Sequence, residues 1–116
     1  MKNGCMVIDR RSKKVIEDLF KSFLVKYFNK GPSLTKVYIS ENFMAIYCKD
    51  ILTPMEKNIA TDAYGKCLIH VFRKKILDNK KSEFLKTVDE SVDVKIYSLY
   101  MDLDIVHDSL CCAFIL

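Results

Sequence analysis

Residues 51–58 read Ile-Leu-Thr-Pro-Met-Glu-Lys-Asn, a helix-start signal that follows a strand pattern and constrains the fold more than any other segment. Thr53 suits the N-cap, because its hydroxyl can accept a hydrogen bond from an amide of the first helical turn. Pro54 fits the first helical position, where an amide would have no helical partner, and Glu56 completes a capping box. The segment therefore predicts a β-to-α junction, and it specifies no reaction.

The length of 116 residues and the hydrophobic fraction of 50% predict one domain over residues 1–116, with enough apolar residues for a core. We expect residues 1–8, which precede the first periodic pattern, to be flexible. No apolar run approaches the ~20 residues that a membrane-spanning helix needs, and no signal-peptide pattern precedes Asp9. We expect a cytoplasmic protein without a membrane span, which leaves peripheral contact with the inner membrane face open.

The first predicted helix covers residues 9–29, where apolar pairs recur at four-residue spacing between charged positions. Its predicted end is the segment 29–32. Gly31 suits the left-handed position that closes a helix, and Pro32 cannot continue one. A hairpin follows over residues 35–49, with a turn at Glu41 and Asn42 in which asparagine tolerates a positive φ. The second strand of this hairpin is apolar on both faces, which predicts an interior strand.

The second half of the chain predicts a central helix from Pro54, a short helix capped by Ser82, and strands over residues 92–101 and 109–116. We expect Gly65 to mark a close contact or a bend within the central helix, and residues 78–81 to interrupt the helical pattern. The predicted buried stripe of the central helix consists of Ala60, Tyr64, Cys67, Leu68, Val71, Phe72 and Ile76.

The predicted order is therefore α-β-β-α-α-β-β, an α+β fold with one four-stranded, mainly antiparallel sheet and helices on one face. The other face would carry Tyr38, Tyr47 and Tyr97 or their strand neighbours. An apolar face of that size is typical of an interface. Because closed symmetric dimers are the commonest assemblies, the sequence predicts a homodimer.

Most of the chain resembles the MpsC/YbcI-like family, long described as a domain of unknown function. The similar pieces are residues 30–32, 36–40, 51–57, 65–73, 96–102 and 114–116, so that Gly31, Pro32, Thr53, Pro54 and Glu56 are structural motif positions. The resemblance implies an accessory or regulatory link to a sodium-translocating, membrane-potential-generating system. It implies a protein partner, with a membrane transport subunit as the candidate, and a non-catalytic interaction domain.

Net charge is +4, with basic residues concentrated in residues 1–30 and 73–81. Lys57, Arg73, Lys74 and Lys75 form the candidate surface for a partner or an anion. Such patches can contact phosphates, so a small-ligand or nucleic-acid-binding regulatory module is the alternative function. Nucleic acid is the less favoured partner, because the remainder of the chain is net acidic.

The segment 102–108 contains the only cluster of ligand-type residues, Asp102, Asp104, His107 and Asp108. Oxygen ligands of this kind suit divalent cations. The segment lacks the glycine and ordered spacing of a calcium loop, so we expect a solvated turn, no metal and no cofactor. A metal-binding sensor remains a third alternative.

The five cysteines fit no zinc pattern. We expect Cys48 and Cys67 to be buried as small apolar residues, and Cys111 and Cys112 to point to opposite faces of a strand. Cys67 and His70 are neighbours on one helix, yet a nucleophilic cysteine also needs an orienting group and an oxyanion donor. The sequence therefore predicts no enzyme.

Overall fold

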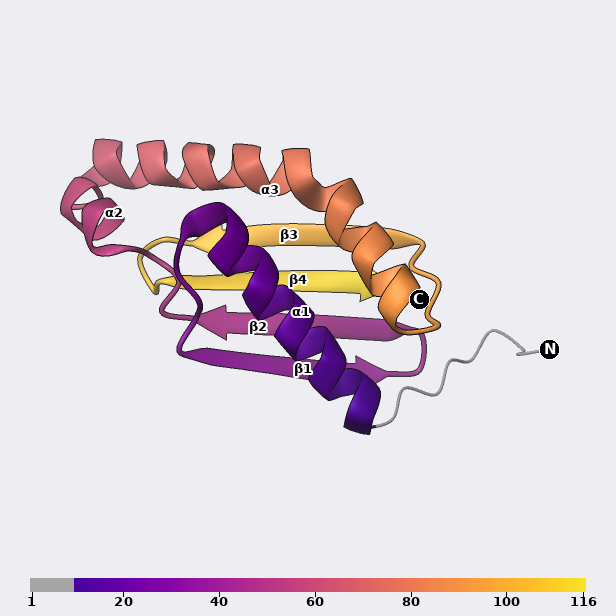
Figure 1. Ribbon diagram of the computed structural model, residues 1–116. Helices are drawn as coiled ribbons and strands as arrows, with labels where there is room; N and C mark the ends of the chain where they lie inside the picture. The colour runs from indigo at the N-terminus through magenta and orange to yellow at the C-terminus, as the bar shows by residue number, and fades with distance from the viewer. Residues whose placement is uncertain (1–9) are drawn as a thin grey trace.

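The computed structural model describes residues 10–116. Residues 1–9 lie outside the described part, and they include Cys5 and the segment predicted to be flexible. The elements follow one another in the predicted order (Figure 1). They are α1 (Arg10–Phe28), β1 (Leu34–Ser40), β2 (Phe43–Lys49), α2 (Pro54–Ile59), α3 (Ala63–Ser91), β3 (Ser98–Asp104) and β4 (Ser109–Ile115).

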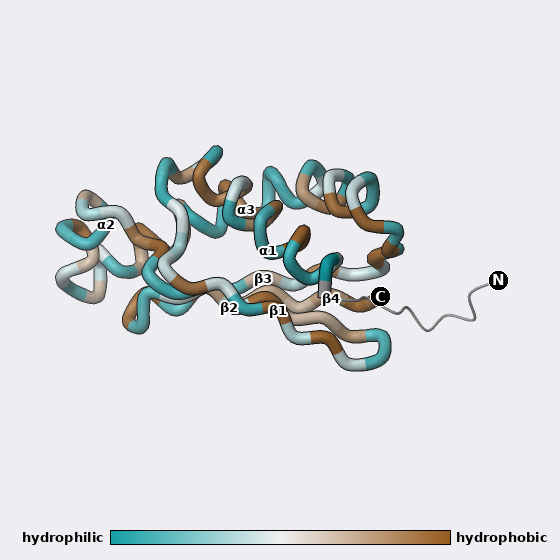
Figure 2. The backbone as a smooth tube through the Cα atoms, turned by 60° about the horizontal axis from the view of Figure 1, so that its bottom comes forward, coloured by the Kyte–Doolittle hydropathy of each residue, from teal (hydrophilic) through white to brown (hydrophobic). Residues whose placement is uncertain are grey.

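The four strands form one sheet in the order β1-β2-β4-β3, and each neighbouring pair is antiparallel. The helices lie over one face of the sheet and no described element covers the other (Figures 1 and 2). The predicted fold class is thus confirmed. The prediction that β2 is an interior strand is also confirmed, because it pairs with both β1 and β4.

The core lies between the sheet and the helices. Met44, Ile46, Cys112 and Phe114 project from the two central strands and have no exposed surface. Above them, Phe84 of α3 contacts Phe20 of α1 edge-on, with ring centroids 5.2 Å apart. Because strand side chains alternate between faces, one residue in two along β2 and β4 builds this core.

The predicted central helix is wrong in its boundaries. Residues 60–62 separate a six-residue α2 from a continuous 29-residue α3, and the predicted break at residues 78–81 is absent. Asp62 caps the new helix by accepting a hydrogen bond from the Gly65 amide at 2.7 Å. A Cβ at Gly65 would lie 1.8 Å from the Ile59 carbonyl oxygen, so glycine permits the close approach of the two helices.

The predicted buried stripe of this helix is also wrong. The buried positions at the start of α3 are Gly65, Ile69, Arg73 and Leu77, spaced by four residues. The predicted members Tyr64, Leu68, Val71 and Phe72 are exposed by 74%, 44%, 60% and 53%, and Cys67 is exposed as well. The inner face of α3 carries a glycine and an arginine, which an apolar pattern does not detect.

Three local predictions need correction. The left-handed residue that ends α1 is Asn29 with φ 60°, not Gly31, and the hairpin turn places its positive φ at Glu41 rather than at Asn42. Residues 92–97 are not a strand: β3 begins at Ser98, which pairs with Ile115, and the segment before it is a loop anchored by buried Val92 and Val94.

Candidate functional site

The junction between β2 and α2 forms as predicted. The Thr53 hydroxyl accepts a hydrogen bond from the Glu56 amide at 3.2 Å, and the Glu56 carboxylate accepts one from the Thr53 amide at 2.8 Å. Pro54 occupies the first turn. The capping box is therefore complete, and its carboxylate also turns inward to a second partner.

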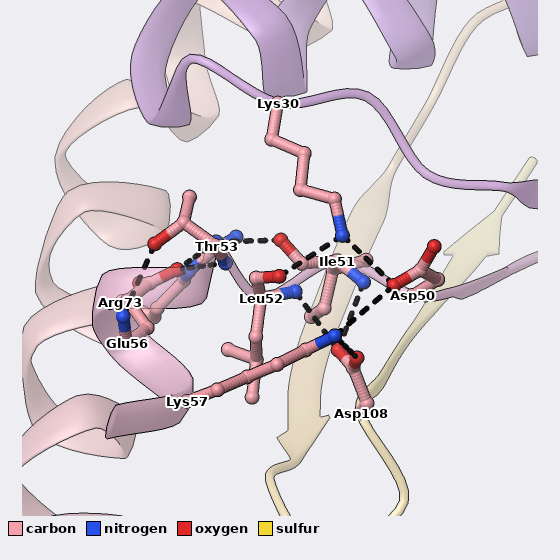
Figure 3. Close-up of polar contacts among 9 residues, drawn as sticks. All are labelled: Lys30, Asp50, Ile51, Leu52, Thr53, Glu56, Lys57, Arg73 and Asp108. Carbon is pink, nitrogen blue, oxygen red and sulfur yellow. Dashed lines mark hydrogen bonds and ion pairs between the residues drawn. The ribbon is translucent and has the colours of Figure 1, made fainter. Parts of the chain in front are cut away.

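That partner is Arg73 of α3. Its guanidinium donates to both carboxylate oxygens of Glu56, at 2.7 and 2.6 Å, and to the Ile51 carbonyl at 2.7 Å. The other side of the guanidinium lies 3.9 Å from the centre of the Phe28 ring. Burial opposes ionisation of Glu56, but hydrogen bonds from Arg73 and Thr53 outweigh it and lower the carboxyl pKa. One arginine thus joins α1, α2, α3 and the segment after β2, and Figure 3 shows its contacts with Glu56 and Ile51.

A second group of charges surrounds the same junction (Figure 3). Asp108, from the β3–β4 turn, accepts hydrogen bonds from the Ile51 and Leu52 amides at 2.8 Å each. Lys30 donates to Asp50 at 2.8 Å, and this contact lowers the Asp50 pKa. Asp108 lies 57 residues from Ile51 in the chain, so no local signal reveals its role.

The four predicted basic surface residues have different surroundings. Arg73 is 1% exposed, so its assignment to a partner or anion surface is wrong. The Lys74 ammonium donates to the Met101 carbonyl at 2.8 Å. Lys57 is half exposed and lies 3.6 Å from Asp50, and Lys75 is exposed. Only Lys57 and Lys75 of this set remain open to a partner.

An exposed apolar surface covers α2 and the start of α3. We call it the α2–α3 surface, and it consists of Met55, Ile59, Tyr64, Leu68, Val71 and Phe72. Met55 and Phe72 also border a groove of about 470 Å³ that reaches Phe28 at the end of α1. Contiguous exposed apolar residues of this kind mark interaction sites.

A second apolar surface is the sheet face without helices (Figure 2). Tyr38, Tyr100 and Phe43 are exposed there by 55%, 64% and 41%. Tyr47 projects from this face too, half-buried, whereas Tyr97 precedes β3 and is 70% exposed. The prediction of an apolar uncovered face is confirmed. Tyr100 belongs to this face, although the predicted strand over residues 92–101 places it on the face opposite to Tyr97.

The acidic segment 102–108 does not converge on one point. Asp102 lies 3.2 Å from His70, Asp104 lies 2.7 Å from His107, and Asp108 binds the Ile51 and Leu52 amides. The hydrogen bonds lower the pKa of Asp104, chiefly through His107. Among residues 10–116, no group of three histidine, cysteine or acidic side chains is arranged to hold a metal ion.

Cys67, His70, Asp102 and Cys111 border an open hollow of about 500 Å³ beside β3. The His70 and Asp102 side chains are 40% and 79% exposed. The other two described cysteines are buried, and burial raises the pKa of the Cys48 thiol to about 11.

No helix within residues 10–116 combines the length and the apolar character required to cross a bilayer. The described fold is an α+β sheet-and-helix layer with exposed apolar residues on both outer sides.

The chain belongs to the MpsC family, whose model, described as "Na+-translocating membrane potential-generating system (MpsC)", matches residues 10–116. This match confirms the resemblance found in the sequence and covers nearly the whole chain. Comparisons with curated proteins and with solved structures find no match.

Proposed function

We propose that this chain is a non-catalytic accessory or regulatory interaction domain of a sodium-translocating, membrane-potential-generating system. The family match links the chain to such a system. The observation that carries the interaction role is the α2–α3 surface, where six large apolar side chains are exposed by 42% to 74%. We place the protein at the cytoplasmic side of the membrane, where a transport subunit can present a segment to it.

The shape and charge of the α2–α3 surface favour a helical partner segment. Tyr64, Leu68 and Val71 recur at helical spacing along α3, and the groove of about 470 Å³ beside Phe72 is large enough to receive a large side chain. An amphipathic helix places apolar anchors at the same spacing into such a groove. Exposed Lys75 lies four residues after Val71, on the same side of α3, so acidic residues beside the partner's anchors would be favoured.

The junction supports this role because it holds the two helices of the surface in one position. The buried Arg73–Glu56 contact holds α2 against α3, the Arg73–Ile51 contact ties both to the segment after β2, and Asp62 caps the start of α3. A surface carried on fixed elements binds without the cost of ordering itself. We also propose that the protein acts as a homodimer, with the uncovered sheet face as the contact.

The test is capture of the partner from native membranes with a tagged chain. The wild-type protein is expected to retain an integral sodium-transport subunit after detergent solubilisation. Val71→Asp places a charge in the apolar surface and is expected to abolish that capture. Recovery of nucleic acid, or of no integral transport subunit, would contradict the proposal.

Val106→Asp is the matched control for this experiment. It is the same substitution at an exposed valine, 70% against 60%, in the β3–β4 turn and outside the six residues of the α2–α3 surface. Both variants are expected to unfold at nearly the same denaturant concentration as the wild type, since neither side chain is part of the core. Equal loss of capture in both variants would also contradict the assignment of the surface.

A further inference from the structure

The uncovered sheet face has a composition that is nearly symmetric about its midline, which runs between β2 and β4. The strand register places outward residues in four rows across the sheet. They are Ser40–Phe43–Ile115–Ser98, Tyr38–Ala45–Ala113–Tyr100, Lys36–Tyr47–Cys111–Asp102 and Leu34–Lys49–Ser109–Asp104. The two outermost residues are serines in the first row and tyrosines in the second, and they carry opposite charges, lysine and aspartate, in the third.

The second row explains how two such faces can pack closely. Ala45 and Ala113 occupy its centre and are half-buried, while Tyr38 and Tyr100 stand at its ends. Two facing sheets lie about 10 Å apart and interdigitate their side chains. The small central residues therefore leave space between the two sheets, into which the tyrosine rings at the ends of the row can lean.

The third row contributes opposite charges at opposite edges. Lys36 lies on β1 and is exposed, and Asp102 lies on β3 with 79% of its side chain exposed. Asp102 stays ionised, since hydrogen bonds from the Leu103 amide and from His70 lower its pKa. Within one chain the two residues are separated by the full width of the sheet, so neither neutralises the other.

We infer that a second copy of this chain covers the uncovered sheet face through a twofold axis parallel to the strands. This inference deepens the proposed homodimer and rests on it. The axis places β1 opposite the partner's β3 and β2 opposite the partner's β4, so that residues of the same row face each other. Lys36 then faces the partner's Asp102, Tyr38 faces the partner's Tyr100, and both contacts occur twice, as an isologous interface requires.

Another twofold arrangement of the same faces lacks this complementarity. A twofold axis that also lies between the two sheets, but runs perpendicular to the strands, would place β1 opposite the partner's β1. The second row would then face the partner's third row. Lys36 would then face the partner's Tyr38 and both Asp102 carboxylates would lack a facing cation. Electrostatic complementarity therefore selects the axis parallel to the strands.

The area of the face is sufficient for a specific dimer. Four strands at about 4.8 Å spacing and seven residues at about 3.4 Å each span a flat area of roughly 450 Å² per copy. Protruding side chains make the accessible area larger than the flat area. Two copies together therefore reach the ~1,000 Å² expected of a specific interface.

Charge reversal tests the geometry, with the dimer dissociation constant measured by sedimentation velocity. Lys36→Asp and Asp102→Lys are each expected to raise that constant by roughly tenfold or more, because both pairs of the dimer become repulsive. The double variant K36D/D102K is expected to restore dimerisation. Single variants that dimerise like the wild type, or a double variant without restoration, would overturn the inference.

Lys86→Asp and Asp89→Lys are the controls, because they change the net charge equally at exposed positions of α3 on the helix side. Both are expected to dimerise as the wild type does. A monomeric wild-type chain that still captures the transport subunit would overturn the dimer alone. A dimer that captures no such subunit would overturn the proposed accessory role alone.

Discussion

The two faces of the sheet are built from the same strands and both carry large apolar side chains, yet only one is covered by described elements of the chain. On the helix side, Ile46 and Phe114 have no exposed surface. On the other side, Tyr38 and Tyr100 are exposed by 55% and 64%. The covered face stabilises the fold in every chain, whereas the uncovered face contributes free energy only when a second surface contacts it.

The α2–α3 surface extends this comparison to the helices. Ile69 and Leu77 of α3 are buried, while Leu68 and Val71 on an adjacent side of the helix are exposed. The residues that stabilise the fold and those of the proposed interaction surface therefore differ, although they lie on the same elements. Substitutions can consequently separate folding from assembly.

The largest expected effect comes from a matched pair of truncations on the two faces. Phe114→Ala is expected to lower the free energy of unfolding by about 3–5 kcal/mol, because it leaves a cavity in the core. Tyr100→Ala is expected to change the unfolding of the single chain by less than ~0.5 kcal/mol and to weaken the dimer. Denaturant titration and sedimentation measure the two effects. Equal destabilisation by both would contradict the distinction between the faces.

Removing the carboxylate of the junction is expected to have the next largest effect. Glu56→Ala leaves the Arg73 charge buried without its partner, a change that costs about 3 kcal/mol or more. Glu56→Ala combined with Arg73→Met removes both charges and is expected to recover part of the lost stability. Thermal unfolding monitored by circular dichroism compares the two. A double variant less stable than the single one would contradict the pairing.

Acid is expected to weaken the same junction without a substitution. The folded protein lowers the Glu56 pKa below its ordinary value of 4.5, so the ionised form contributes stability above that value. The contribution is lost as the pH falls through the folded pKa, because the unfolded chain binds the proton first. The free energy of unfolding should therefore fall below about pH 4.5. The E56A/R73M variant should show a smaller fall, and an identical profile would contradict the role of Glu56.

The smallest expected effect is on the helix cap. Thr53→Ala removes the acceptor for the Glu56 amide and is expected to cost about 1 kcal/mol. Thr53→Ser keeps the hydroxyl and should leave stability within a few tenths of a kcal/mol of the wild type. Denaturant midpoints distinguish them. A loss as large for Thr53→Ser as for Thr53→Ala would contradict the capping role.

The sequence predicts the features that depend on neighbouring residues. The Thr53–Glu56 capping box, the hairpin and the interior position of β2 are of this kind, since cap chemistry and alternation act over a few residues. The order of the elements follows from the same signals. The family match at residues 10–116 agrees with the resemblance carried by those local motifs.

Features that depend on distant contacts are missed. From the sequence alone, Arg73 is predicted to be a surface cation. Its burial depends on the contact with Glu56, which lies 17 residues away in the chain. The inner stripe of α3 contains Gly65 and Arg73, so apolar periodicity selects the exposed side instead. Residues 92–97 alternate like a strand, but no described strand lies opposite them. Asp108 acts on amides that only the fold brings near.

The mass of the wild-type chain in solution tests the central distinction between the two faces most directly. Sedimentation equilibrium at micromolar concentrations is expected to give twice the 13.5 kDa of one chain, with Tyr100→Asp shifting the protein to the single-chain mass. A wild-type protein that remains at 13.5 kDa throughout this range would contradict the proposal that a second copy covers the sheet.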